Sequence, residues 1–176
     1  ITPPLSAGQT LCTAELWPDG TLYAIVSDDA GLTCFTTADQ GATWRQGVSV
    51  RFEDVHAGRK IQKDLAAALP DGSMYYLCRL EDSGAGEVHL YRVLPDGTSA
   101  ELPVAQLSEH NELGEALWLY DLRTRADGKL LLRAMVFPAG QEGYDSGVYK
   151  LLVIDPETGA CEREFSLAGG MDGVFG

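Results

Sequence analysis

The sequence predicts an all-β fold built from three repeated units of four antiparallel strands. Three observations lead to this prediction: an apolar stretch ends in Asp-Gly three times, the spacing between these pairs is nearly constant, and strand-like segments flank each pair. The three glycines are Gly20, Gly72 and Gly128, which gives intervals of 52 and 56 residues. Asp-Gly between alternating apolar runs marks a tight hairpin, because both residues tolerate a positive φ.

Each unit is predicted to contain four strands, the first of which ends at the Asp-Gly turn. A second strand follows that turn, a polar loop leads to the third strand, and a further turn leads to the fourth. The second strands are expected at residues 21–26, 73–80 and 129–137. The third strands are expected at 32–36, 88–94 and 148–154, and the fourth at 43–48, 98–104 and 160–167.

One segment conflicts locally with this pattern. Residues 61–69 are rich in Ala and Leu, which favour helix. Their position in the repeat, directly before the second Asp-Gly pair, is that of a first strand. We therefore expect a strand at 61–69, and a helix there would weaken the repeat interpretation.

Four antiparallel strands repeated about every 50 residues is the pattern of β-propeller blades. The propeller segment is expected at 9–176, with blades at 9–52, 61–105 and 115–167, a linker-like segment at 1–8 and a lead-in to a further blade at 168–176. Propellers close with about four to eight blades, so three units predict part of a larger propeller of about six to eight blades. An alternative is self-association, in which two copies close one ring.

The turn between the third and fourth strands of the first unit carries a specific motif. It reads TADQGATW at residues 37–44. It resembles the Asp box of sialidases and other bacterial-neuraminidase-repeat propellers, and it matches at every fixed position: Thr37, Asp39, Gly41, Thr43 and Trp44. The carboxylate can accept backbone N–H groups of the turn, and the indole can pack beneath it.

This resemblance implies a propeller fold and a structural role for the motif, on the face opposite a sialidase active site. Sialidases also use three arginines, a Tyr–Glu pair and an Arg-Ile-Pro-like motif, and no such motif occurs in this sequence. We therefore expect a non-enzymatic scaffold that binds a carbohydrate or protein ligand, and the catalytic residues stay unknown. The alternative is part of a sialidase-like glycoside hydrolase whose catalytic residues lie mostly outside the chain; a third is an assembly or sorting factor.

Propeller ligands generally bind on the rim formed by the loops between blades and between second and third strands. The candidate rim residues are Glu53, Asp54, His56, Arg59, Glu109, His110, Glu112, Tyr144 and Asp145. Paired carboxylates could serve glycoside hydrolysis, and carboxylates with His could bind a divalent cation. Ordinary solvated loops explain the same residues, so no metal site is assigned.

Composition restricts the class of partner. Hydrophobic residues make up 45% of the 176 residues, which is enough for a folded core despite a net charge of -13. That charge argues against binding nucleic acid or anionic membrane surfaces. No apolar run reaches the roughly 18–20 residues that span a bilayer, and no cofactor motif is found.

The four cysteines and the first residues bear on cellular location. Cys12, Cys34, Cys78 and Cys161 lie in strand-like stretches, which predicts buried free thiols, with two disulfides as the alternative. The chain begins at Ile1 without a leader, and the segment after it is linker-like. We therefore expect an extracytoplasmic protein, secreted or lipid-anchored, whose leader has been removed.

Overall fold

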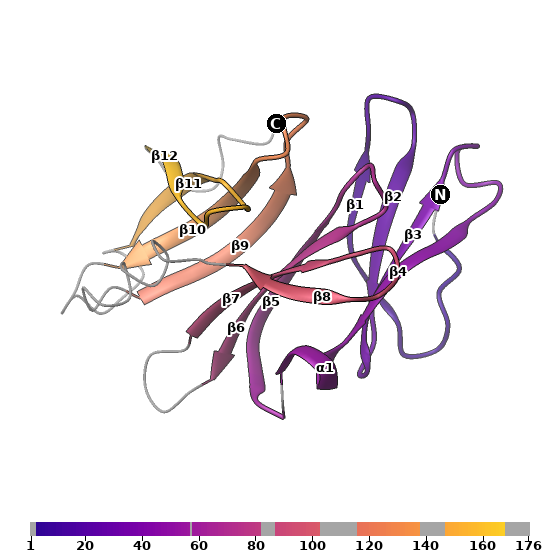
Figure 1. The fold of residues 1–176 in the computed structure, drawn as a ribbon, viewed down its shortest axis with the longest axis horizontal. Coiled ribbons are helices and arrows are strands. Elements are labelled where there is room, and N and C mark those ends of the chain that lie inside the picture. Colours follow the sequence, from indigo (N-terminus) through magenta and orange to yellow (C-terminus); the bar gives the residue numbers. More distant parts are fainter. Residues whose placement is uncertain (1–2, 57, 82–86, 103–115, 138–146, 168–176) are drawn as a thin grey trace.

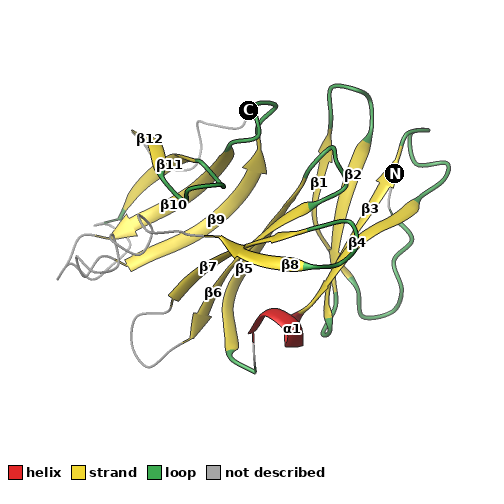
Figure 2. Cartoon of the chain, in the orientation of Figure 1, coloured by secondary structure: helices red, strands yellow, loops and turns green. Residues whose placement is uncertain are grey.

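A computed structural model describes residues 3–56, 58–81, 87–102, 116–137 and 147–167. These residues form three four-stranded antiparallel sheets and one short helix (Figure 1; Figure 2). The prediction of an all-β chain with three four-stranded units is therefore confirmed. None of the three described sheets is closed on itself.

In each sheet the strands follow one another in sequence order, so each hairpin joins neighbours. The first sheet contains β1 (Thr10–Leu16), β2 (Leu22–Ser27), β3 (Gly31–Thr37) and β4 (Arg45–Arg51). The second contains β5 (Lys60–Ala68), β6 (Met74–Glu81), β7 (Glu87–Val93) and β8 (Ser99–Leu102). The third contains β9 (Ala116–Thr124), β10 (Leu130–Phe137), β11 (Val148–Ile154) and β12 (Cys161–Ser166). The helix α1 (Phe52–His56) leads from the first sheet to the second.

The segment 61–69 forms β5 and not a helix, as its position in the repeat predicted. Tertiary packing explains this outcome. Ala67 packs toward the third sheet, whereas Ala66 and Ala68 pack toward the first. Because both faces of β5 are covered, small side chains fit on both, and burial overrides local helix propensity.

The Asp-Gly turns share one geometry. In the first, the Gly20 amide donates to the Trp17 carbonyl at 2.9 Å, and Gly20 has a φ of 86°. The Asp19 carboxylate accepts the Thr21 amide at 2.9 Å. Equivalent bonds hold the turns at Gly72, Gly97 and Gly128, with φ values of 82°, 85° and 82°. The left-handed glycine and the carboxylate acceptor explain why Asp-Gly recurs at these turns.

The core consists of two apolar layers, one on each face of the second sheet. Alternation along β6 produces both layers: Tyr76 and Cys78 pack toward the first sheet, while Tyr75 and Leu77 pack toward the third. The second sheet therefore lies between the other two (Figure 1). At one end of β5, the Thr124 hydroxyl of β9 donates to the Ala68 carbonyl at 2.9 Å.

None of the four cysteines forms a disulfide, but they differ in exposure. Cys34 and Cys78 are buried and Cys161 is half-buried, whereas Cys12 is exposed. The prediction of a buried thiol is therefore wrong for Cys12. It lies at an irregularity in the pairing of β1, an edge strand, where the alternation of the two faces is interrupted.

Candidate functional site

The turn at residues 37–44 is held by the side chains that the motif specifies. The Thr37 hydroxyl donates to the Asp39 carboxylate at 2.7 Å and accepts the Gly41 amide at 3.0 Å. Thr43 donates to Asp39 through its amide, at 2.9 Å, and through its hydroxyl, at 2.5 Å. Gln40 and Gly41 both have positive φ, of 59° and 89°. Each of these hydrogen bonds joins residues of the turn itself, as expected for a structural motif.

These hydrogen bonds also fix the charge of the turn. Donation from Thr43 and Thr37 lowers the pKa of Asp39 to about 2, because each bond favours the ionised carboxylate. Asp39 therefore stays ionised throughout the neutral range.

The rim residues that the sequence predicted divide into two groups at α1. Glu53 and Asp54 are exposed and pair with Arg51, at 2.8 Å and 3.0 Å. His56 points inward and is only 2% exposed. Arg59 donates to the His56 carbonyl at 3.3 Å. The two carboxylates and the imidazole therefore do not converge on one site.

The remaining five candidates lie outside the described residues: Glu109, His110, Glu112, Tyr144 and Asp145.

His56 belongs to a buried aromatic cluster that attaches α1 to the second sheet. Its Nε2 atom is 2.7 Å from the Tyr76 hydroxyl, and its ring stacks on Phe52 with centroids 5.0 Å apart. The Tyr91 hydroxyl donates to the Val55 carbonyl at 3.2 Å. Burial lowers the pKa of His56, so the imidazole is neutral at pH 7. This cluster stabilises the connection between the sheets.

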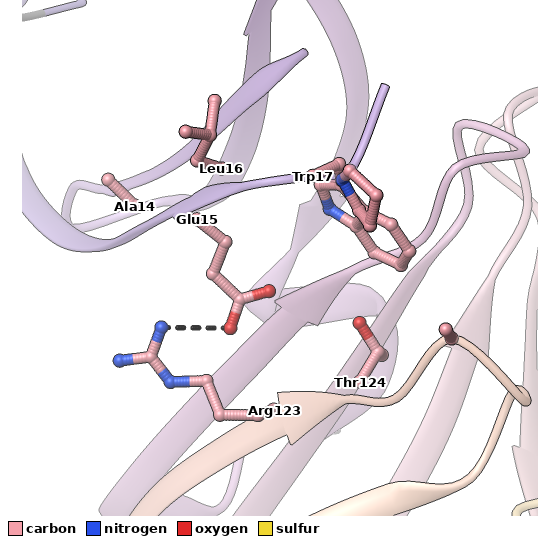
Figure 3. Close-up of a pocket in the computed structure, with 8 residues that line it drawn as sticks. Ala14, Glu15, Leu16, Trp17, Arg123 and Thr124 are labelled. Carbon is pink, nitrogen blue, oxygen red and sulfur yellow. Dashed lines mark hydrogen bonds and ion pairs between the residues drawn. The ribbon is translucent and has the colours of Figure 1, made fainter. Parts of the chain in front are cut away.

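A pocket of about 390 Å³ lies where β1 and β9, the first strands of the first and third sheets, end (Figure 3). Its volume falls within the range of about 300–1,000 Å³ that is typical of small-molecule sites. Its lining consists of Ala14, Glu15, Leu16, Trp17, Pro18, Arg123, Thr124 and Ala126. The first and third sheets therefore share one concave site, although 108 residues separate Glu15 from Arg123.

An ion-pair cluster forms one side of the pocket. Arg123 donates from Nη1 to Glu15 at 2.9 Å and from Nε to Asp121 at 3.1 Å (Figure 3 draws the first). The Glu15 side chain is only 14% exposed. Burial raises the pKa of Glu15, although the bond to Arg123 opposes this shift. Two carboxylates thus share one guanidinium beside the cavity.

Trp17 supplies the aromatic side chain in the lining of the pocket. Its indole packs edge-on against Tyr23, with ring centroids 5.7 Å apart. Its Nε1–H is buried and has no acceptor among the residues that the structure describes. Leu16, beside it, is 73% exposed. The pocket therefore pairs a charged wall with an aromatic one.

The candidate residues predicted from the sequence lie in loops of the other rim, and none of them lines this pocket. A usable signal was present, since Glu15 and Arg123 each stand five residues before the glycine of an Asp-Gly turn. Opposite charges at equivalent repeat positions indicate that the two first strands could meet. The second unit has the small Ala67 at that position.

Comparison with known proteins adds no identification: no protein-family model matches the chain, and no curated protein matches it. Within the described ranges, no helix has the length and apolar character needed to cross a membrane. In that same part of the chain, no group of three His, Cys, Asp or Glu side chains could hold a metal ion.

Proposed function

We propose that this chain is a segment of a β-propeller that acts as a non-enzymatic, extracytoplasmic binding scaffold. The observation that carries the proposal is the pocket shared by the first and third sheets, with Glu15 and Arg123 on one side and Trp17 on another. The Asp-box resemblance at residues 37–44 supports the propeller fold, and the linker-like first residues support the extracytoplasmic location.

Equivalent residues of the repeat support the stacking that a propeller requires. Ile25 and Leu77 each stand five residues after the glycine of an Asp-Gly turn. Ile25 is buried against the second sheet and Leu77 against the third. The first and second sheets therefore each direct the same face toward the sheet that follows, as successive propeller blades do.

The third sheet has large apolar side chains on its other face. Trp118 is 39% exposed and Phe165 is 48% exposed. A further blade would cover this face, since exposed aromatic surface of this kind is otherwise unfavourable in water. These residues favour a propeller of more than three blades.

Three of the nine arginines are occupied in a way that favours binding over sialidase-like hydrolysis at their positions. A sialidase needs arginines that are free to bind a substrate carboxylate. Here Arg123 binds Glu15 and Asp121, Arg51 binds Glu53 and Asp54, and Arg92 binds Asp71 and Glu157. These three guanidinium groups are neutralised by carboxylates of the chain itself.

The test is a comparison of the wild-type chain with Trp17→Ala on arrays of glycans and of peptides. Loss of the aromatic wall is expected to lower the affinity for the ligands that the wild type binds at least tenfold. Trp118→Ala, a substitution of the same kind outside the pocket, is expected to leave that affinity unchanged. A panel of aryl glycosides, including sialosides, tests for catalysis in parallel.

Two results would contradict the proposal. One is turnover of any glycoside that disappears in the Glu15→Gln variant, which would make the pocket an active site. The other is a ligand that both tryptophan variants bind as well as the wild type does, which would place the binding site elsewhere.

A further inference from the structure

We infer that the pocket at Glu15, Trp17 and Arg123 accepts a cationic side chain, a lysine or arginine of a partner protein. This inference rests on the proposed binding function and names the chemistry of the ligand. The ligand class follows from the charge of the pocket wall, the aromatic surface beside it and the charge of the whole chain.

The ion-pair cluster at the pocket is negative. Glu15 lines the pocket, Asp121 lies outside the lining, and Arg123 binds both, which leaves one negative charge in excess in this cluster. The described bonds to Arg123 use a single oxygen of each carboxylate, Oε1 of Glu15 and Oδ2 of Asp121. A cation entering the pocket therefore finds further acceptor capacity on these carboxylates.

The long-range field has the same sign. The chain carries a net charge of -13. The Asp-Gly turn after Trp17 places Asp19 close to the pocket in sequence, whereas Asp127, in the turn after Arg123, pairs with Arg125 at 3.0 Å. A field of this sign accelerates association with cations and slows association with anions, and salt weakens both effects.

The aromatic wall distinguishes a basic side chain from a simple metal cation. The face of an indole attracts ammonium and guanidinium groups through its quadrupole. Leu16, 73% exposed, and Pro18 add apolar surface beside the indole. The methylene stem of a lysine or arginine can cover part of this surface, and the adjoining peptide adds contacts that a free alkylamine lacks.

The direct experiment is an NMR titration of the ¹⁵N-labelled chain that follows the indole N–H signals. The probes are acetylated Gly-Lys-Gly and Gly-Arg-Gly amides, with Gly-Glu-Gly amide, methyl glucoside and butylamine for comparison. A Trp17→Phe variant assigns the Trp17 signal. The basic peptides are expected to shift that signal, to bind at least tenfold more tightly than the other probes, and to lose affinity when NaCl is raised from 50 to 500 mM.

Matched variants separate the pocket from general attraction to an acidic protein. Glu15→Gln removes the excess negative charge of the cluster and is expected to lower the affinity for the basic peptides at least tenfold. Glu157→Gln is the control, because Glu157 also shares an arginine with an aspartate, Arg92 with Asp71, outside the pocket. Arg123→Gln removes the competing cation and is expected to strengthen binding severalfold, a gain that a misfolded variant could not give.

Each other outcome overturns the inference. Equal weakening by Glu15→Gln and Glu157→Gln would assign the binding to overall charge, and weaker binding by Arg123→Gln would make the guanidinium the recognising group. Butylamine binding as tightly as the peptides would assign the pocket to small amines. If methyl glucoside alone shifts the Trp17 signal, the inference fails while the proposed binding function stands.

Discussion

The carboxylate of Glu15 in the first sheet lies 2.9 Å from the guanidinium of Arg123 in the third. The two residues occupy the same position of the repeat, five residues before the glycine of an Asp-Gly turn. This ion pair joins the ends of the chain's first and last units across the intervening β5. It is also the wall of the only site to which we assign a ligand.

The stacking of the sheets predicts different costs for two neighbouring leucines of β10. Leu132 is fully buried in the layer between the second and third sheets, whereas Leu131 lies on the other face and is partly exposed. Leu132→Ala is expected to lower the free energy of unfolding by about 2–5 kcal/mol, and Leu131→Ala by less than half as much. Urea denaturation measures both. Equal losses would mean that the described face of the third sheet does not form the core layer.

The buried imidazole of His56 predicts a loss of stability in mild acid. Burial lowers its pKa in the folded state, opposed by Asp64 and assisted by Arg59 and His89. The unfolded chain therefore binds a proton near pH 6.5 that the folded chain does not. The contribution of the neutral imidazole to the free energy of unfolding is fully present above that pH. It falls as the pH drops below 6.5, by at most about 1.4 kcal/mol per pH unit for one proton.

The variant His56→Gln isolates this effect, because an amide can still bond the Tyr76 hydroxyl. Its unfolding free energy, measured by urea denaturation between pH 7.5 and pH 5.5, should change less than that of the wild type. If the unfolding free energy of the two proteins depends on pH in the same way, His56 has the same pKa in the folded and unfolded chain, and the prediction is wrong.

The turn at residues 37–44 predicts a second, more acidic transition. The folded pKa of Asp39, about 2, lies below the ordinary value of 3.8. Its contribution to stability is therefore present above about pH 4 and is lost as the pH falls through 2. Asp39→Asn is expected to lower the thermal midpoint by several degrees at pH 5 and to leave it nearly unchanged at pH 2. An unchanged midpoint at pH 5 would mean that the carboxylate does not hold the turn.

The cysteines are predicted to differ in reactivity. Burial raises the pKa of Cys34 and of Cys78 to about 12, so their thiolate fraction at pH 8 is on the order of one part in ten thousand. Cys12 is exposed. A disulfide reagent at pH 8 should modify Cys12 at least about 100-fold faster than the two buried thiols, and Cys12→Ser should remove this fast phase. Rapid modification that persists in Cys12→Ser and maps to Cys78 would contradict the described core.

Local chemistry explains the parts of the fold that could be predicted from sequence. The Asp-Gly turns depend on two adjacent residues, Gly for a positive φ and Asp for the acceptor, so their hairpins were predictable. The repeat then identified β5 correctly against its helical composition, because position in a repeat reports tertiary environment. Cys12 was not predictable in the same way, since the irregularity in β1 leaves no mark in the residue pattern.

The candidate site was harder to predict because its residues come from strands and not from loops. Glu15 and Arg123 look like ordinary charged positions at strand ends. Their proximity depends on how the first and third sheets stack on the second, which is a property of side-chain packing throughout the core. The rim loops, by contrast, are visible in sequence as clusters of charged residues. Of the cluster at α1, Glu53 and Asp54 are exposed to solvent, whereas His56 is buried in the core.

The most direct test of the account is a double-mutant cycle on Glu15→Gln and Arg123→Gln, measured by urea denaturation at low salt. The pair makes one wall of the pocket only if the first and third sheets meet as described. We expect a coupling free energy of at least about 0.5 kcal/mol, because residues in contact are non-additive on that scale. Losses that add to within about 0.3 kcal/mol would mean that the two side chains are not in contact, and the shared pocket would not exist.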